Sequence, residues 1–344
     1  MKPMLFPAPL QHRHFVNARH QFTELVRGSP GGKVLALVGP TQVGKSLIFE
    51  QLVRTLNQEL RTEEPGAMPL VSLVVATSQD GRISTKHLNL KLLKALRHPI
   101  YEHIGEFDEL KHYRPSRGRD EGSMRVALEA ALAARSTMYV MLDEAHHLTH
   151  TNNIGLRANV IQSIKCVGAI DRTLVLVGGY ELAYRGLFDS AHFAGRLVCV
   201  ELAPYAANSD DLAEWIRILK FCSKHVTVTP ESLLLDEAEQ LLEATNGCFG
   251  LLEKILWVGR SLSGSCSIDR ARLRAAFPLK KEHGAVKIDI DAGKKALACI
   301  AAGELAGSVG SIPPKSQELR KPRSRPFKRK PNRTLPSSPV LADE

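Results

Sequence analysis

The most constraining feature of this sequence is the segment GPTQVGKS, residues 39–46. It fits the pattern GxxxxGK[ST], and it lies between an apolar, strand-like run at 33–38 and a run at 46–60 whose apolar residues repeat at helical spacing. In that setting the glycines allow backbone N–H groups to surround a β-phosphate, and the start of the helix adds its positive dipole end. The segment therefore predicts a phosphate-binding loop made of Gly39, Pro40, Thr41, Gln42, Val43, Gly44, Lys45 and Ser46.

A second motif lies about 100 residues downstream, where the apolar run at 137–142 leads directly into Asp143 and Glu144. In a phosphate-loop protein, Lys45 reaches the β- and γ-phosphates, and Ser46 and Asp143 are the expected oxygen ligands of Mg²⁺. Glu144 would then polarise the attacking water. Together the two motifs predict nucleotide hydrolysis.

Strand-like and helix-like segments alternate through the first 204 residues. The strand-like runs are 33–38, 70–76, 137–142 and 173–177, and the helical ones include 46–60, 88–96, 124–134 and 158–167. This alternation predicts a parallel sheet covered on both faces. After about residue 204 only helical patterns remain. We therefore expect the α/β fold of an AAA+ P-loop NTPase, followed by a small helical lid domain.

Composition refines this division of the chain. The net charge is +10, and residues 311–344 hold nine Lys/Arg against three acids, or +6, together with seven prolines. Such a segment buries too little apolar surface to offset its ordering entropy, so we predict that it is disordered. The predicted organisation is an N-terminal extension (1–30), an α/β nucleotide-binding domain (31–204), a helical lid domain (205–280), a helical extension (281–310) and a basic, proline-rich tail (311–344).

Other classes of protein are disfavoured by the same sequence. No run approaches the roughly 18 consecutive apolar residues of a membrane span, so no membrane partner is expected. Residues 1–10 lack the features of an export signal. The six cysteines are far apart and include no CxxC pair. These observations predict a cytoplasmic protein with reduced thiols.

Three further features have alternative interpretations. The letters DEAH at 143–146 suggest a helicase, but a helicase needs a second motor domain and only one phosphate loop is present. His146, His147 and His150 have the spacing of a metal site, yet no fourth ligand accompanies them, which favours a polar helix face. In AAA+ proteins an arginine of a neighbouring subunit completes the site. Arg196 is our candidate for this role and Arg185 is its rival.

The chain resembles the TniB/TnsC family of AAA+ transposition regulators over residues 15–280. The resemblance rests on GPTQVGKS (39–46), PLVSLVVATSQDG (69–81), LLKALRHP (92–99), MLDEAHHL (141–148), ANVIQSIKCV (158–167), LVLVGGYEL (174–182) and ATNGCFGLLEKI (244–255). It implies an ATP- and Mg²⁺-dependent ATPase that forms rings or filaments on duplex DNA. It also implies that the protein links a TniQ-like target selector to a DDE transposase, in a bacterial, nucleoid-associated setting.

Two departures from the family pattern affect the expected activity. The fourth strand ends in Gly178-Gly179-Tyr180, where the family usually has a polar sensor residue. The second sensor is usually an arginine, and the segment GCFGLLEK offers Lys254 instead, which we predict to contact the γ-phosphate. Hydrolysis is therefore expected to be slow and regulatory.

The expected DNA contacts are to phosphate groups, and the candidates are Arg82 and Lys86, which follow the second strand. Two other functions remain open. One is an IstB- or DnaC-like helicase loader that prefers single-stranded DNA. The other is a scaffold that assembles with nucleotide but does not hydrolyse it.

Overall fold

The computed structural model describes residue 6 and residues 10–76, 84–103, 120–149, 171–185, 188, 195–263 and 267–302. The predicted helix at 158–167 and the basic tail lie outside these residues. So do Arg82 and His150.

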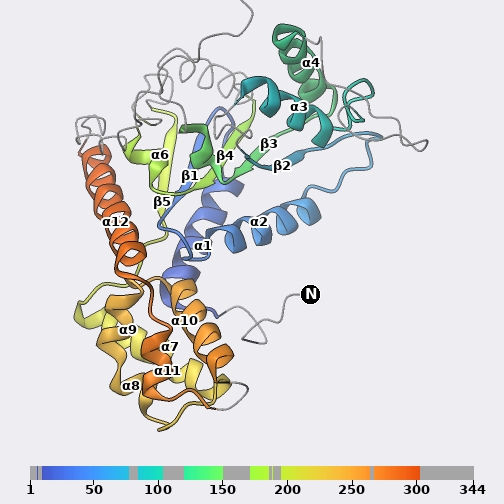
Figure 1. The fold of residues 1–344 in the computed structure, drawn as a ribbon. Helices are drawn as coiled ribbons and strands as arrows, with labels where there is room; N and C mark the ends of the chain where they lie inside the picture. The colour runs from blue at the N-terminus through green and yellow to red at the C-terminus, as the bar shows by residue number, and fades with distance from the viewer. Residues whose placement is uncertain are drawn as a thin grey trace, which may run out of the picture. The chain divides into compact units, whose positions relative to one another are not determined.

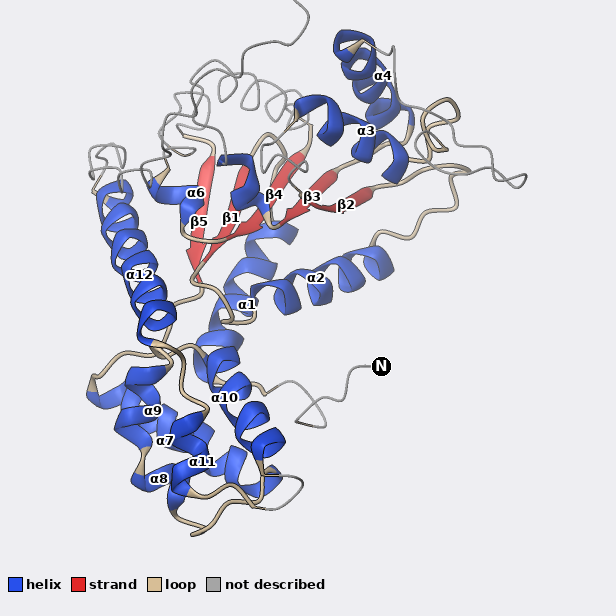
Figure 2. Cartoon of the chain, in the orientation of Figure 1, coloured by secondary structure: helices blue, strands red, loops and turns tan. Residues whose placement is uncertain are grey.

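The centre of the structure is a five-stranded sheet in which every pair of neighbouring strands is parallel (Figures 1 and 2). The strands are β1 (Val34–Val38), β2 (Leu70–Val74), β3 (Tyr139–Asp143), β4 (Thr173–Gly178) and β5 (Leu197–Glu201). Their order is β2-β3-β4-β1-β5. Strand β4 therefore separates the strand that carries the phosphate loop from the strand that ends in Asp143.

Four of these strands match the runs expected from the sequence, and β5 was not predicted. Strand β1 is buried throughout its length, whereas β5 pairs with β1 alone and has the mixed burial of an edge strand. Its sequence, LVCVE, has four apolar residues followed by an acid, as YVMLD of β3 has, so the sequence did carry the signal of a strand here. The fifth strand is a correction to the sequence analysis.

Helices precede and follow the strands in this part of the chain. They are α1 (Arg13–Arg27), α2 (Lys45–Glu59), α3 (Thr85–Ala95), α4 (Glu121–Ala134), the 3₁₀-helix η1 (Ala145–Thr149) and α6 (Glu181–Tyr184). Contacts join α1 to β1 and β5, and α2 to β2, β3 and β4. Helices α3 and α4 pack together beside β2 (Figure 2).

A second, all-helical hydrophobic core follows β5. Its helices are α7 (Ser209–His225), α8 (Leu233–Asp236), α9 (Ala238–Ala244), α10 (Phe249–Leu262) and α11 (Arg270–Ala275). Trp215 is fully buried in this core. The apolar run at 233–242 suggested one helix, but the structure has two, α8 and α9, which meet at Glu237. Glu237 is 2% exposed and is paired with Arg270 and Arg274.

The last described helix, α12 (Lys280–Ala301), packs on α6 and buries its apolar face against the core around the sheet. Residues 286–291 have the sequence VKIDID, which resembles an acidic strand end, but they lie inside this helix. Among the described residues, no helix is both long enough and apolar enough to cross a membrane.

His12, the N-cap residue of α1, makes stability depend on pH. Its Nδ1 accepts hydrogen bonds from the Tyr205 hydroxyl (3.0 Å) and the Phe15 backbone N–H (3.4 Å). Burial, together with the charge of His14, lowers the pKa of His12 to about 4. The unfolded chain, with a His pKa of about 6.5, therefore binds an extra proton between these two values.

We therefore expect the free energy of unfolding to fall by up to about 1.4 kcal/mol per pH unit as pH decreases from about 6.5 towards 4. His146, described below, adds to this slope. Urea denaturation at several pH values measures it. His12→Asn keeps a capping side chain and should flatten the profile, while His20→Asn, at an exposed position of the same helix, should not. Equal slopes in both variants would contradict this explanation.

Candidate nucleotide site

The loop of residues 39–44 joins β1 to α2, and its backbone needs glycine at both ends. Gly44 is the N-cap of α2 and has a φ of 105°, in the left-handed region that side chains disfavour. At Gly39 a Cβ atom would lie 2.5 Å from the Leu202 carbonyl oxygen. The loop therefore places the N-terminus of a 15-residue helix at the carboxyl edge of the sheet, where the geometry suits a phosphate group.

Lys45 is the first residue of α2, and its ammonium group lies inside this loop. Its Nζ donates hydrogen bonds to the carbonyl oxygens of Gly39 (3.0 Å) and Pro40 (2.6 Å). Burial lowers the pKa of Lys45, and the nearby carboxylates of Glu144 and Asp289 oppose this shift. Asp289 belongs to α12, so the charges that act on Lys45 come from distant parts of the sequence.

Ser46 and Asp143 lie together, as predicted for a pair of Mg²⁺ ligands. Asp143 ends β3, is 6% exposed, and accepts hydrogen bonds from the Ser46 hydroxyl and from the Glu144 backbone N–H (2.8 Å). Burial nevertheless raises the pKa of Asp143. A hydroxyl and a carboxylate beside a phosphate loop are the oxygen donors that Mg²⁺ prefers, so these residues fit the cation.

Glu144 follows the strand with a φ of 52°, and its carboxylate lies next to His146 of η1. The His146 Nδ1 is 3.2 Å from Glu144 Oε2 and 3.4 Å from the Gly179 backbone nitrogen. Burial is the main cause that lowers the pKa of His146 to about 4, so this ring is neutral at pH 7. Because the Gly179 backbone N–H donates to Nδ1, the neutral ring lies beside the Glu144 carboxylate without donating a hydrogen bond from that atom. The sequence analysis had placed His146 only on a polar helix face.

The glycines at the end of β4 have a structural reason. A Cβ atom at Gly178 would lie 2.8 Å from the His146 backbone nitrogen, because η1 packs directly on this strand end. The position that the family usually gives to a polar sensor is thus closed to a side chain here. His146, which approaches from η1, is the polar group that contacts this strand end.

Helix α10 of the second core contacts the phosphate loop. The Gly250 backbone N–H donates to the Gln42 carbonyl oxygen at 2.8 Å, and a Cβ atom at Gly250 would lie 2.5 Å from that oxygen. Lys254, on the same helix, is 56% exposed and its Nζ lies 3.7 Å from a carboxylate oxygen of Glu282. The structure therefore pairs Lys254 with α12, and its contact with a γ-phosphate stays a prediction.

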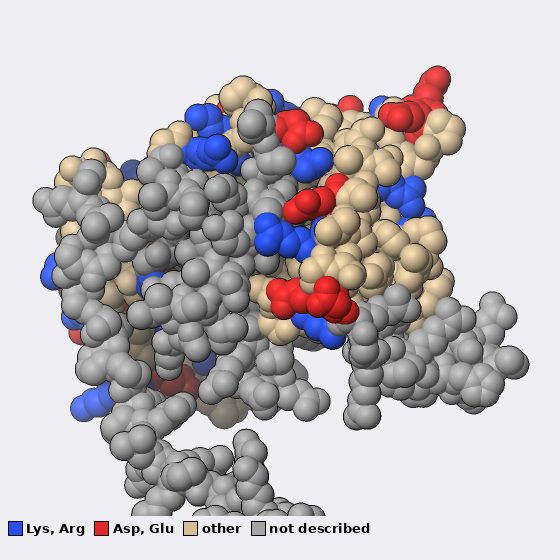
Figure 3. All heavy atoms as spheres, turned by 90° about the horizontal axis from the view of Figure 1, so that it is seen from above, with Lys and Arg blue, Asp and Glu red and all other residues tan. Residues whose placement is uncertain are grey.

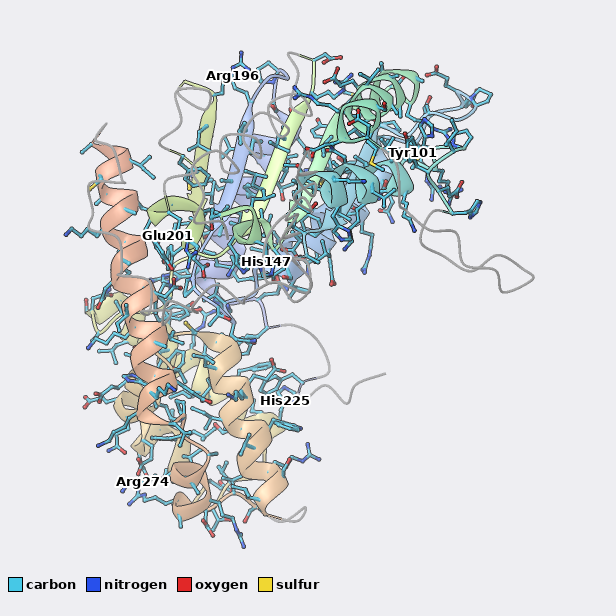
Figure 4. All side chains as sticks on the ribbon, turned by 45° about the horizontal axis from the view of Figure 1, so that its top comes forward. Tyr101, His147, Arg196, Glu201, His225 and Arg274 are labelled. Carbon is cyan, nitrogen blue, oxygen red and sulfur yellow. The ribbon has the colours of Figure 1, made fainter. Side chains whose placement is uncertain are left out.

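Arg196 lies at the opposite edge of the sheet from the phosphate loop. It directly precedes β5, and its carbonyl oxygen accepts a hydrogen bond from Val34, the first residue of β1. In Figure 4, Arg196 and Glu201 lie at opposite ends of β5. A strand of this length spans roughly 16 Å, which separates Arg196 from the loop of its own chain. Arg185, the rival candidate, acts within its own chain. Its positive charge lowers the pKa values of both His146 and Asp289.

The DNA candidates are only partly described. Arg82 lies outside the described residues. Lys86 is half-buried in the first turn of α3, whose N-cap is Ser84. On the face shown in Figure 3, the described Lys and Arg side chains are interspersed with Asp and Glu. Both DNA candidates stay predictions.

Glu144, His146 and His147 place one ligand atom each within 4.8 Å of one another, a loose arrangement for a metal site. His150, the third histidine of the sequence pattern, lies outside the described residues. The Glu144–His146 contact is explained by the nucleotide site itself.

The sheet order, the phosphate loop and the acidic end of β3 define the α/β AAA+ P-loop NTPase fold. Residues 29–185 match the family model described as "AAA domain". A search of curated proteins found no match.

Three solved structures are similar to this chain to different degrees, and the first of them supports the fold. The ADP form of the ORC2 protein of Aeropyrum pernix is 15% identical, with a TM-score of 0.52 over 80% of this chain and 70% of that chain. A Walker-type ATPase of Pyrococcus abyssi is 16% identical, with a TM-score of 0.47 over 87% and 79% of the two chains. Domain III of the initiation protein DnaA of Thermotoga maritima is 14% identical, with a TM-score of 0.41 over 79% and 93%. At such identities the likeness concerns the fold.

Proposed function

We propose that this chain is an ATPase that binds duplex DNA, assembles into a ring or filament in its ATP-bound form, and regulates transposition. The observation that carries assembly is the position of Arg196 at the sheet edge opposite to the phosphate loop. An arginine there can complete only a neighbour's site. Lys45, Ser46, Asp143 and Glu144 converge at the other edge and supply the rest of that site.

The chemistry follows from where each group lies. Lys45 and the backbone of residues 39–44 hold the phosphates of ATP, and Ser46 with Asp143 would hold Mg²⁺. When bound, Mg²⁺ neutralises charge on the β- and γ-phosphates. Glu144, which lies beside His146, accepts a proton from the attacking water. The neighbour's Arg196 stabilises the negative charge that develops on the γ-phosphate in the transition state.

The role in transposition rests on the resemblance to TniB/TnsC proteins and on the basic segment 311–344. A regulator of this kind joins a TniQ-like selector to a DDE transposase while it is bound to DNA. Phosphate contacts from Arg82 and Lys86 would provide binding without base recognition. We propose a cytoplasmic, bacterial, nucleoid-associated protein with slow, regulatory hydrolysis.

Anisotropy of labelled duplex and single-stranded DNA of equal length tests this proposal against a helicase loader. With a non-hydrolysable ATP analogue, we expect duplex binding that is at least about tenfold tighter than with ADP. The logarithm of the affinity should fall linearly with the logarithm of the salt concentration, because the contacts are to phosphate. Preference for the single strand would contradict the regulator and favour the IstB- or DnaC-like loader.

Lys254→Ala tests the predicted second sensor. If Lys254 leaves Glu282 and contacts the γ-phosphate, the change should weaken ATP binding about three- to tenfold without affecting ADP, because one charge-assisted contact is lost. Lys281→Ala, an exposed lysine of α12, serves as the control. Unchanged ATP affinity and turnover would rule out this role for Lys254.

A further inference from the structure

One acidic side chain lies within the buried stripe of α12. On this face Ile290, Gly293 and Ala296 are buried, at the helical spacing of an apolar stripe. Asp289 is half-buried beside them, and its Oδ1 accepts a hydrogen bond from the Tyr184 hydroxyl at 2.9 Å. A carboxylate in such a position has a desolvation cost, so its presence there calls for a functional explanation.

The docking of α12 is sterically specific. A Cβ atom at Gly293 would lie 2.1 Å from Cγ of Tyr180, a residue that is fully buried at the end of β4. The Tyr180 hydroxyl in turn donates a hydrogen bond to Glu201 at the end of β5. The helix is thus held against the carboxyl edge of the sheet (Figure 1), where the phosphate loop also lies.

With α12 docked in this position, the charges of the Asp289 carboxylate and the Lys45 ammonium act on each other. Asp289 raises the pKa of Lys45, and Lys45 lowers the pKa of Asp289. Among the described carboxylates that raise the pKa of Lys45, Glu144 has the largest effect and Asp289 the next. Burial is the main cause that raises the pKa of Asp289 to about 6, with Glu181 adding to it and Tyr184, Lys45 and Arg185 opposing it. The group is therefore mostly ionised at pH 7.

We infer that Asp289 is part of the nucleotide site, and that the docked helix α12 and the triphosphate compete for the Lys45 ammonium. A bound nucleotide brings several negative charges to Lys45, and a carboxylate whose charge also acts on Lys45 repels them. The repulsion is largest for ATP, whose γ-phosphate adds charge. By thermodynamic reciprocity, ATP must weaken the docking of α12 as much as docked α12 weakens ATP binding.

The inference rests on the proposed nucleotide site and can be tested in the full-length chain by removing the charge. Asp289→Asn keeps an oxygen that accepts the Tyr184 hydrogen bond. It should tighten ATP binding about tenfold and ADP binding less, the size of one charge interaction that solvent partly screens. Asp291→Asn removes the same charge from an exposed position of the same helix and should leave both affinities unchanged.

A second pair of variants tests the docking of α12 rather than the charge of Asp289. Gly293→Ala places a methyl group against Tyr180, so it should undock α12 and also tighten ATP binding. Gly284→Ala is the matched control, because a Cβ atom there meets nothing within 4 Å. Hydrogen exchange of residues 280–301 should be faster in Gly293→Ala, and in the wild-type chain faster with a non-hydrolysable ATP analogue than without nucleotide.

Equal ATP affinity in Asp289→Asn and Asp291→Asn would overturn the inference, as would weaker binding in Asp289→Asn, which would make this carboxylate a favourable contact. In either case, ATP binding by the wild-type chain would leave the proposed function intact. A wild-type chain that binds neither ATP nor ADP would instead refute the proposed function.

Discussion

Replacing Glu144 with glutamine is expected to lower the rate of ATP hydrolysis at least about a hundredfold while leaving ATP binding within about threefold of the wild type. The amide has nearly the shape of the carboxylate but cannot accept a proton from water. The charge of the Glu144 carboxylate raises the pKa of Lys45, and its Oε2 lies 3.2 Å from the His146 Nδ1. These neighbours set the position of the side chain. The substitution should therefore change chemistry and not architecture.

Phosphate release and binding of a fluorescent ATP analogue should be measured on the same preparation. Glu129→Gln is a suitable control, because Glu129 is 49% exposed on α4 and pairs with Arg125 at i,i+4 spacing. Turnover in Glu144→Gln close to the wild-type rate would show that another group activates the water. A wild-type chain that assembles with ATP but has no measurable turnover would favour the non-hydrolysing scaffold.

The second large effect concerns Arg196. Arg196→Ala should reduce turnover about a thousandfold, the contribution typical of an arginine supplied by a neighbouring subunit, while each chain still binds ATP. Glu144→Gln keeps Arg196 and ATP binding but lacks the group that accepts a proton from water. Each variant alone is then inactive for a different reason.

Mixing the two variants separates action within a chain from action between chains. In a random oligomer, about a quarter of the sites would combine an intact Glu144 from one variant with an intact Arg196 from the other. Turnover should therefore return to about a quarter of the wild-type value. Arg185→Ala mixed with Glu144→Gln should show no such recovery, because Arg185 acts on His146 and Asp289 of its own chain. Recovery in the Arg185→Ala mixture and not in the Arg196→Ala mixture would reverse the two assignments.

Much of the sheet was predictable because buried parallel strands are continuous apolar runs. VLALV and YVMLD are buried along their whole length, and each leads directly into a polar motif at the carboxyl edge. The loop also follows from sequence, since the αL backbone at Gly44 and the close approach at Gly39 require glycine. Strand β5 was missed although LVCVE has the same four apolar residues and final acid as YVMLD, and its place beside β1 depends on pairing between segments far apart in the sequence.

The remaining site residues depend on contacts between distant segments. Asp289 lies in a run that resembles an acidic strand end, and only the packing of α12 on α6 brings it near Lys45. His146 meets Glu144 because η1 turns immediately after β3 and packs on β4. One sequence signal was available for this contact: Gly178 and Gly179 leave the backbone space that the η1 turn occupies.

Electron microscopy of the negatively stained protein tests the central claim, which is assembly on duplex DNA driven by ATP. The protein should be imaged with ATP, a non-hydrolysable analogue or ADP, each with and without duplex DNA. The account predicts rings or filaments only where a triphosphate and duplex DNA are both present, and their loss in Lys45→Ala. Monomers under every condition would contradict it, as would the same assemblies with ADP.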